Sequence, residues 1–374
     1  MSNRAEAIID LNALESNVKH ILKGTSADGL AVVKADAYGH GLVPIAKRAI
    51  EAGASWVGTA LLEESIQLRD SGISVPILAW LTPLQEDFES ALQKRIDLAV
   101  PSIEHLEAIQ QAAARTSTTP RIHLEVDTGM TRGGALSEWR TLLKAVSQLV
   151  KNGRVEVIGI WSHFARADEP GHPFNEEQLS NFKYRVKEAE ELGIRAKILH
   201  LSNSAASLID QKSHFDLIRM GIAMYGLSPD VEKLGDSKKL GLKPVMSLRA
   251  RLQLVKEVPA GAQVGYGGTA VTTTATKIGV VAMGYADGVP RNADNRAGVL
   301  VGNRKAPILG RVSMDQFVVD LGNDSIARTG DWAYLIGSEG GDGYTADAWG
   351  RACGTINYEI VTRIGPRVPR VFIN

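Results

Sequence analysis

The feature that most constrains the fold is an alternation, kept up over the first 227 residues, between short apolar runs and longer stretches with helical periodicity. Eight of the runs are typical of buried strands, namely 30–33, 56–60, 77–81, 97–100, 122–126, 157–161, 198–201 and 216–218. Because eight consecutive strand–helix units can close on themselves, the pattern predicts an α/β fold of the (β/α)8 TIM-like barrel type. An open doubly wound sheet is the alternative, since periodicity alone does not show closure.

The sequence changes in character beyond the eighth run. Residues 228–243 are polar, charged and interrupted by glycine, as linkers often are. Segments rich in β-branched residues then follow, with turn residues between them, and one helix is expected near 345–351. At 374 residues the chain has room for a barrel of roughly 250 residues and a second domain. We therefore predict a barrel over 1–235 and a β-rich C-terminal domain over 236–374.

The composition excludes several classes of partner. The chain has 42 Lys and Arg against 42 Asp and Glu, so its net charge predicts neither nucleic-acid nor membrane binding and favours a small-molecule ligand. The single cysteine, Cys353, cannot form an intrachain disulfide, and we expect it to be a small buried residue. No run approaches the roughly 20 apolar residues of a membrane span, and the first residues lack the apolar core of a signal peptide. We therefore expect a cytoplasmic protein. HExxH and paired CxxC motifs are also absent, so we expect no bound metal.

Residues at the carboxyl ends of the predicted strands are the first candidates for a site, because barrel enzymes place their chemistry there. Five of the runs are followed by such candidates: Lys34, Asp127, Arg132, His163, Asn203, Ser204, Arg219 and Gly221. Lys34 comes directly after two valines, and burial there would lower its pKa and favour a Schiff-base nucleophile over a solvated lysine. Backbone N–H groups around Gly221 suit a phosphate, with an ordinary turn as the alternative.

Motifs along nearly the whole chain resemble those of one enzyme family. They are VVKADAYGHG (32–41), VDTGMTRGG (126–134), SHFARADE (162–169), HLSNSAA (200–206), VGYGGT (264–269), GYADGVPR (284–291), GRVSMDQ (310–316) and GTINYEIVTRIGPRVPRV (354–371). In this order they resemble the motifs of alanine racemases. The resemblance implies a pyridoxal 5'-phosphate enzyme that interconverts L- and D-alanine for peptidoglycan, as a homodimer whose β-rich domain completes the partner's site.

The resemblance also implies a role for each matching residue. Lys34 is similar to the lysine that forms the internal aldimine and acts as the base on one face of the substrate Cα, and Tyr266 is similar to the opposite base, from the other subunit. Further cofactor-binding positions are matched by Tyr38, His163, Asn203, Ser204, Arg219, Gly221, Ile222 and Tyr358, where Arg219 faces the pyridine nitrogen. Arg132 and the backbone at Met314 match substrate contacts, Tyr285 and Tyr358 match the substrate access channel, and Asp315 matches a supporting residue.

This chemistry explains why two acid–base groups are needed. Racemisation removes a proton from one face of Cα and delivers another to the opposite face, and the cofactor supplies the electron sink. A phenol with an ordinary pKa of about 10 is almost fully protonated at pH 7, so such a base needs cationic help. The family arrangement suggests that His163 and Arg219 provide it for Tyr266.

Glu125 is a departure from the family pattern. Many relatives carry a carbamylated lysine at this position, which orients the arginine that corresponds to Arg132. The alternation of IHLEVD places Glu125 on the same strand face as His123, which we expect to be the barrel interior. We expect the Glu125 carboxylate to replace the carbamate and pair with Arg132. Alternatively, Glu125 satisfies another interior group.

Other functions remain open at this point. A basic-amino-acid decarboxylase also joins a barrel to a β domain, but the VGYGGT motif around Tyr266 and the absence of the decarboxylases' C-terminal cysteine-acid motif favour racemisation. A non-catalytic pyridoxal-phosphate carrier would lack the β-rich domain. Serine or another amino acid could be a substrate, and the role could be catabolic. We expect His40, within YGHG, to form structural hydrogen bonds.

Overall fold

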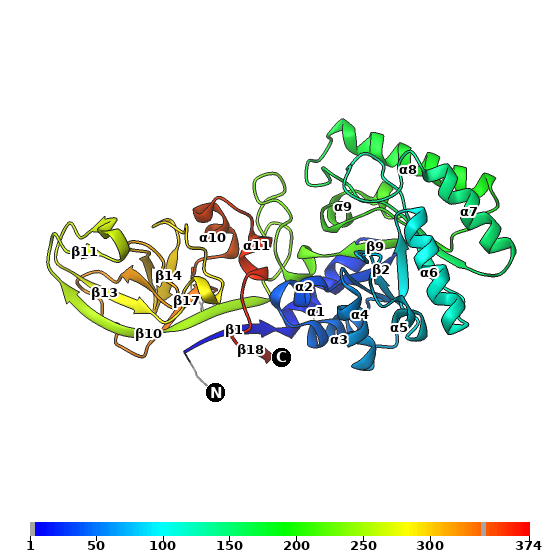
Figure 1. The fold of residues 1–374 in the computed structure, drawn as a ribbon. Coiled ribbons are helices and arrows are strands. Elements are labelled where there is room, and N and C mark those ends of the chain that lie inside the picture. The colour runs from blue at the N-terminus through cyan, green and yellow to red at the C-terminus, as the bar shows by residue number, and fades with distance from the viewer. Residues whose placement is uncertain (1–3, 338–341) are drawn as a thin grey trace. The chain divides into compact units, whose positions relative to one another are not determined.

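A computed structural model describes residues 4–337 and 342–374, which form two compact units (Figure 1). The first, called here the barrel unit, comprises Ala13–Ala37 and Leu42–Lys243. The second, called here the β-rich unit, comprises residues 4–12, Tyr38–Gly41 and the chain from Pro244 onward. Each unit has its own sheet and its own buried core.

The barrel unit is built on eight parallel strands that follow one another in chain order. They are β2 (Asp28–Val32), β3 (Trp56–Thr59), β4 (Ile77–Ala79), β5 (Asp97–Val100), β6 (Arg121–Glu125), β7 (Glu156–Trp161), β8 (Ile198–His200) and β9 (Leu217–Met220). The last strand pairs with the first, with Leu30 opposite Arg219. Between β8 and β9 the Arg219 N–H donates to the Ser202 carbonyl at 3.1 Å. The predicted barrel is confirmed, and the sequential strand order rules out the doubly wound alternative.

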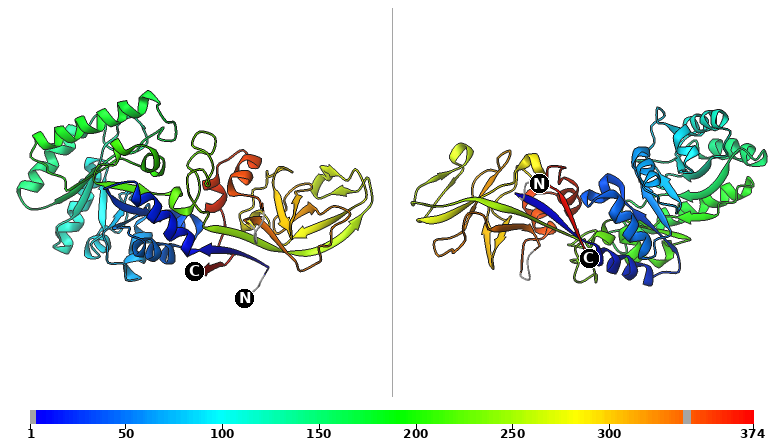
Figure 2. Two further views of the ribbon diagram at one scale, coloured as in Figure 1. Left: turned by 180° about the vertical axis from the view of Figure 1, so that it is seen from behind. Right: turned by 90° about the horizontal axis from the view of Figure 1, so that it is seen from below.

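Helices flank the strands of the barrel unit (Figures 1 and 2). They are α1 (Leu11–Lys23), α3 (Leu42–Glu51), α4 (Leu62–Asp70), α5 (Phe88–Gln93), α6 (Ile103–Thr116), α7 (Trp139–Lys151), α8 (Pro173–Glu191) and α9 (Ser204–Ile209). Along β6, Ile122 and Leu124 point outward into an apolar core that includes Trp139 of α7 and Phe182 of α8. This alternation leaves the other face of β6 to the barrel interior, as the sequence predicts.

The β-rich unit is organised around one long strand, β10 (Met246–Val258). Its first half pairs antiparallel with β1 (Ala5–Asp10) and β17 (Trp332–Ile336), and its second half pairs with β13 (Thr276–Val281). The same sheet contains β14 (Gly298–Val301), β15 (Arg304–Pro307), β16 (Phe317–Asp320) and β18 (Arg370–Ile373), and a separate ladder joins β11 (Gln263–Val264) to β12 (Ala270–Val271). Sequence reasoning missed β1, whose buried positions are the small Ala5 and Ala7 together with Ile9.

Two α-helices lie near the C-terminal end of the β-rich unit, as far as the structure describes it. The predicted helix near 345–351 is observed as α10 (Ala346–Cys353), where the Thr345 hydroxyl caps the helix by accepting a 3.1 Å hydrogen bond from the Ala348 N–H. The second, α11 (Asn357–Thr362), was not predicted. Burial raises the pKa of the Cys353 thiol to about 11, in agreement with the expected buried, unreactive cysteine. Within the described parts of the chain, no helix is both long and apolar enough to cross a membrane.

Candidate active site

Most of the candidate residues lie at the carboxyl ends of the parallel strands. Lys34 follows β2, Glu125 ends β6, His163 follows β7, and Arg219 lies in β9 next to β2 in the sheet. Because parallel strands of a barrel all end at one mouth, these side chains come from different parts of the sequence to one face of the barrel unit.

Arg219 is the most highly connected of these residues. Its Nη2 donates to the carbonyl oxygens of Ser162 at 2.9 Å and Leu201 at 3.1 Å, and to Nδ1 of His163 at 3.1 Å. The guanidinium carbon lies 5.2 Å from the centre of the Trp161 ring. Burial lowers the pKa of Arg219 to about 9, so the group is cationic at neutral pH.

The contact with Arg219 fixes the protonation of His163. Burial, followed by the charge of Arg219, lowers the pKa of His163 well below its ordinary value, so the imidazole is neutral. A guanidinium can only donate, so Nδ1 of His163 is the acceptor and the ring proton is on Nε2. The site therefore holds one buried cation and, beside it, a neutral imidazole with one N–H still to donate.

Lys34 has the properties of a reactive amine. Burial is the main cause that lowers its pKa, and the positive charge of Arg132 acts in the same direction. The backbone that follows Lys34 is unusual, because Ala35, Asp36, Ala37 and Tyr38 have φ values of 56°, 52°, 53° and 52°. Four consecutive left-handed residues form α2 (Lys34–Gly39), although none of these four is glycine. The Asp36 carboxylate supports this turn by accepting a 2.8 Å hydrogen bond from the Leu42 N–H.

The left-handed turn leads to a test of backbone strain. Ala35 is exposed, and a left-handed conformation costs an alanine about 1–2 kcal/mol that glycine avoids. We expect Ala35→Gly to leave the free energy of unfolding unchanged or raise it by about 1 kcal/mol, although glycine normally destabilises helices. Ala108→Gly, in the right-handed helix α6, is the matched control and should lower it by about 1 kcal/mol. Equal losses in urea unfolding of both variants would contradict the strain argument.

The loop after β6 places Arg132 near Glu125. Asp127 accepts hydrogen bonds from the N–H groups of Gly129 at 2.8 Å and Thr131 at 3.1 Å, which turn the chain back toward the strand. The turn is tight, since a Cβ at Gly133 would lie 2.8 Å from Oε1 of Glu125. Among the described residues, Glu125 forms no direct ion pair with Arg132.

The electrostatic surroundings of Glu125 are still dominated by arginine. Burial raises the pKa of the Glu125 carboxyl to about 7, while the charges of Arg219 and Arg132 partly oppose this rise. Two arginines at the barrel mouth, Arg132 and Arg219, thus act on a carboxyl that titrates near neutrality. Such a mouth suits an anionic ligand.

Ser204 begins α9 and Gly221 directly follows β9, and the two residues are in contact. The Gly221 N–H donates to Oγ of Ser204 at 2.8 Å, and Asn203 caps α9 by accepting a 3.2 Å hydrogen bond from the Ala206 N–H. Ile222 is fully buried at the start of the 3-10 turn Ile222–Tyr225. A hydroxyl next to a glycine N–H is a donor pair that a phosphate can use.

The remaining predicted residues belong to the β-rich unit. Tyr266 lies in the turn Tyr266–Gly268 and is 72% exposed, and Met314 is 53% exposed. Tyr285 lies next to Met314, because the Tyr285 N–H donates to the Ser313 carbonyl at 3.0 Å. Asp315 accepts a 2.6 Å hydrogen bond from Nη2 of Arg367.

Tyr38 and Tyr358 come together although 320 residues separate them in the sequence. Their ring centres are 6.3 Å apart, and burial raises the pKa of the Tyr38 phenol well above its ordinary range. The Nδ1–H of His40 donates a 2.9 Å hydrogen bond to the Tyr38 carbonyl, because a carbonyl oxygen can only accept. His40 is thus the structural residue that the sequence predicts.

Sequence reasoning missed three residues around Lys34 and Arg219. His200 contacts Arg219, and His123 contacts His200 in turn. Tyr225 donates from its hydroxyl to the Val32 carbonyl at 2.8 Å, two residues before Lys34. Only His123 left a signal in the sequence, namely its place on the same face of the strand as Glu125.

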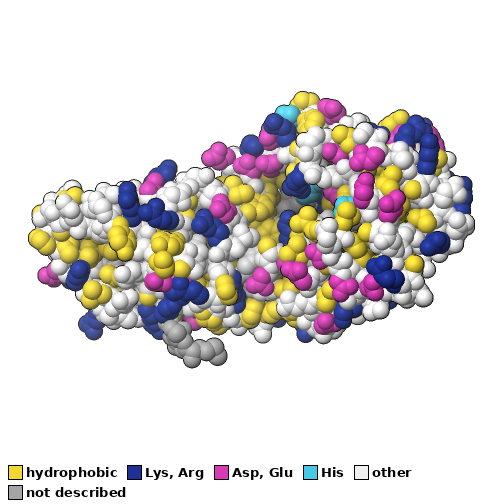
Figure 3. Space-filling model, viewed as in Figure 1, with side chains coloured by type: hydrophobic (Ala, Val, Ile, Leu, Met, Phe, Trp, Pro, Cys, Tyr) yellow, Lys and Arg dark blue, Asp and Glu magenta, His cyan; other side chains and the backbone are white. Residues whose placement is uncertain are grey.

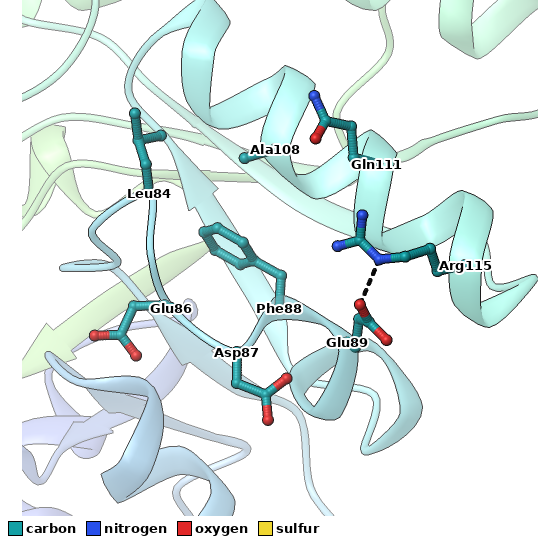
Figure 4. A pocket seen from close by; sticks show the side chains of 8 residues that line it. All are labelled: Leu84, Glu86, Asp87, Phe88, Glu89, Ala108, Gln111 and Arg115. Carbon is teal, nitrogen blue, oxygen red and sulfur yellow. Dashed lines mark hydrogen bonds and ion pairs between the residues drawn. The ribbon is translucent and has the colours of Figure 1, made fainter.

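A separate cavity of about 130 Å³ lies at the surface of the barrel unit beside α5 and α6 (Figure 4). It is lined by Leu84, Glu86, Asp87, Phe88, Glu89, Ala108, Gln111 and Arg115. Arg115 is paired with Glu89 across its rim, and none of the candidate residues borders it. We therefore locate the site at the barrel mouth.

Comparisons with known proteins show the family of the chain. Residues 9–229 match the family "Alanine racemase, N-terminal domain", and residues 245–372 match "Alanine racemase, C-terminal domain". A curated alanine racemase of Salinispora tropica is 47% identical over 99% of this chain and 98% of its own length, and one of Streptomyces coelicolor is 44% identical over 99% and 96%.

Solved structures give the same result. The alanine racemase of Streptomyces lavendulae, described as a D-cycloserine producer, has a TM-score of 0.97 at 45% identity and covers 100% of this chain and 98% of its own. That of Bacillus anthracis with bound L-Ala-P has a TM-score of 0.90 at 36% identity, with coverage of 100% and 96%. Fold, site and both family matches lead to one conclusion: the chain belongs to the alanine racemase family.

Proposed function

We propose that this amino-acid racemase interconverts L- and D-alanine with pyridoxal 5'-phosphate held at the barrel mouth, and supplies D-alanine for peptidoglycan. The observation that carries the proposal is the pairing of β2 with β9, which brings Lys34 and Arg219 to neighbouring strand ends. The residues present fit the cofactor: an amine of lowered pKa for its aldehyde, a buried guanidinium for its ring nitrogen, and the Ser204–Gly221 pair for its phosphate. When bound, the cofactor withdraws electrons from the substrate Cα.

Each acid–base group then serves one face of the substrate. Lys34 Nζ exchanges a proton with Cα on one face, and its lowered pKa increases the share of the neutral amine. The Tyr266 phenol exchanges the proton on the opposite face. His163 would stabilise the phenolate with a hydrogen bond from its Nε2–H, and Arg219 would supply the positive charge.

The exposure of Tyr266 supports a site that is shared between the two subunits of a homodimer. A phenol that is 72% exposed is poorly placed to work as a base, because water competes for it. Apolar side chains are exposed over much of the β-rich unit (Figure 3), among them Tyr266, Val271, Tyr285, Met314 and Ile356. We infer that a second copy covers this surface and brings its barrel mouth to Tyr266, with Met314 and Tyr285 contacting substrate on its way in.

Glu125 is proposed to orient Arg132 through its charge, in place of a carbamylated lysine. We expect Glu125→Gln to lower kcat/KM about tenfold, because Arg132 would lose the electrostatic attraction of the Glu125 carboxylate. In the parent enzyme, kcat/KM should fall as the pH drops through about 7, where the carboxyl is protonated. Glu107→Gln, on the exposed face of α6, is the matched control. Carbonate-free buffer should change nothing, and a fully active Glu125→Gln enzyme would remove this role.

Glu125→Gln should raise the stability of the folded chain at high pH, although it lowers kcat/KM. The pKa of Glu125 is about 7 in the folded chain and 4.5 without burial, so the folded state binds the proton more tightly. Stability linked to Glu125 is therefore fully present below pH 4.5 and is lost as the pH rises through about 7, by roughly 3 kcal/mol. Glu125→Gln removes this loss, and we expect a higher Tm than the parent at pH 8.

The proposed reaction is tested by incubating the cofactor-loaded protein with L-alanine and separating the enantiomers by chiral chromatography. Formation of D-alanine until the two enantiomers are equal supports the proposal. Faster turnover of L-serine would change the substrate, and release of carbon dioxide from a basic amino acid would revive the decarboxylase alternative. Binding of the cofactor without turnover of any amino acid would favour the carrier alternative.

A further inference from the structure

A row of buried polar side chains in contact with one another runs from Arg219 into the barrel interior. Nη1 of Arg219 lies 3.3 Å from Nδ1 of His200, whose Nε2 lies 2.9 Å from Nδ1 of His123. Nε2 of His123 lies 3.5 Å from Oδ2 of Asp97, which is longer than a formed hydrogen bond, and this buried nitrogen has no hydrogen-bond partner among the described residues. Asp97, His123 and His200 are all completely buried. These contacts thus link β9 through β8 and β6 to β5.

Asp97 is the charged group at the far end of this row of side chains. Arg121 donates to both of its oxygens, with Nε at 2.6 Å and Nη2 at 2.9 Å. Burial alone would raise the pKa of Asp97, but the interactions with His123 and Arg121 outweigh burial and lower it. Asp97 is therefore a carboxylate, and it can only accept hydrogen bonds.

The two ends together determine where both imidazole protons lie. Burial lowers the pKa of His123 and His200, so both rings are neutral, with one donor and one acceptor each. Arg219 can only donate to Nδ1 of His200, so the proton of His200 is on Nε2 and is donated to Nδ1 of His123. The proton of His123 must then also be on Nε2, directed at Asp97. One arrangement alone satisfies every contact.

We propose that Asp97, His123 and His200 form a directional hydrogen-bond relay that positions the Arg219 guanidinium at the barrel mouth. Its catalytic importance rests on the proposed function, in which Arg219 faces the cofactor's ring nitrogen. The three are positioning residues, because they act through Arg219. Each donated proton makes the next acceptor nitrogen more basic, so the carboxylate of Asp97 strengthens the hydrogen bond that His200 accepts from Arg219.

The packing around the relay holds its rings in place. The ring of Trp161 stacks on His200 with centres 5.7 Å apart and an interplanar angle of 3°, and Trp56 contacts His123 edge-on at 5.5 Å. Gly159 of β7 lies directly opposite His123 in the sheet. A Cβ at Gly159 would overlap Nδ1 of His123 and lie 2.8 Å from its Cε1, so this strand position leaves space for the imidazole.

Gly159→Ala tests the relay without removing any of its polar groups. We expect the added methyl group to displace His123, break its contact with His200 and lower kcat about tenfold, with KM changed less than twofold. Gly24→Ala is the matched control, because its Cβ would meet only the Ile21 carbonyl oxygen at an ordinary 3.4 Å. Asp97→Asn is the second variant, which keeps the shape of the side chain and removes the anion, and we expect kcat to fall in the same direction.

The tautomers provide a readout that needs neither cofactor nor turnover. In cofactor-free protein labelled with ¹⁵N-histidine, we expect both His123 and His200 to carry their proton on Nε2, with signals identified by their loss in His123→Gln and His200→Gln. Gly159→Ala and Asp97→Asn should shift the His200 nitrogen resonances. A simple space-filling role would leave the His200 signals unchanged in both variants.

The possible results separate the relay from the proposed function. A proton on Nδ1 of His200, or variants that change neither its signals nor kcat, would overturn the relay even if alanine is racemised. Nε2 tautomers and shifted signals in a protein that turns over no amino acid would support the relay as a positioning device and reject the proposed racemisation.

Discussion

Replacing Lys34 by alanine is expected to reduce the racemisation of alanine by at least about 10⁴-fold, because the variant loses both the attachment point of the cofactor and one of the two acid–base groups. Lys34 is suited to both tasks, since its pKa is lowered by burial and by Arg132. Chiral chromatography measures the loss. Borohydride reduction of the cofactor-loaded parent followed by peptide mass spectrometry should find the cofactor on the peptide that contains Lys34.

A matched control and a rescue make this prediction specific. Lys47→Ala, at an exposed position of α3, should keep the activity of the parent enzyme. Added methylamine should partly restore turnover to Lys34→Ala, because a free amine can occupy the space of the lost side chain. Cofactor found on a different lysine, or an active Lys34→Ala enzyme, would contradict the assignment.

Tyr266→Phe should have the second largest effect, a loss of about 10²- to 10⁴-fold in racemisation. The variant keeps the aromatic ring and removes only the hydroxyl, so binding of the cofactor should be unchanged. In deuterated water, Lys34 should still exchange the Cα proton of one enantiomer of alanine, whereas the other enantiomer should exchange no faster than it racemises. Tyr184→Phe, an exposed tyrosine of the barrel unit, is the control. Equal exchange of both enantiomers in Tyr266→Phe would exclude the two-base mechanism.

The two variants can also be combined to test the shared site. If Lys34 of one subunit works with Tyr266 of its partner, a mixed dimer of Lys34→Ala and Tyr266→Phe chains has one site with both substitutions and one with neither. After random exchange of equal amounts, half of the dimers are mixed, so activity should recover to about a quarter of the parent value. A mixture as inactive as the separate variants would show that both bases come from one chain.

The sequence was most informative where local patterns decide the structure. The eight barrel strands could be predicted because each is a short buried run between helices. The candidate site could be predicted because Lys34 comes just after the first of these runs and Arg219 lies near the end of the last. Strand β1 could not be predicted in the same way, because its stability comes from pairing with β10 more than 200 residues later.

Two parts of the site could not be predicted from local sequence patterns. The left-handed turn after Lys34 contains alanines, an aspartate and a tyrosine, residues that favour right-handed conformations, so surrounding structure must enforce it. The relay joins residues from strands that lie far apart in the sequence, and His123 and His200 are 77 positions apart. Contacts of this kind depend on closure of the barrel, which no local pattern encodes.

The position of β1 has a consequence for the order in which the chain acquires its structure. β1 lies between β10 and β18, and its Ala7 pairs with Arg370, so both strands that pair with β1 are synthesised long after it, on the far side of the barrel unit in the sequence. The barrel unit is complete in sequence by Lys243, before β10 has been made. In the pairing of the folded chain, β1 therefore has no partner strand until β10 has been made, and its backbone groups are open to other strands during that interval.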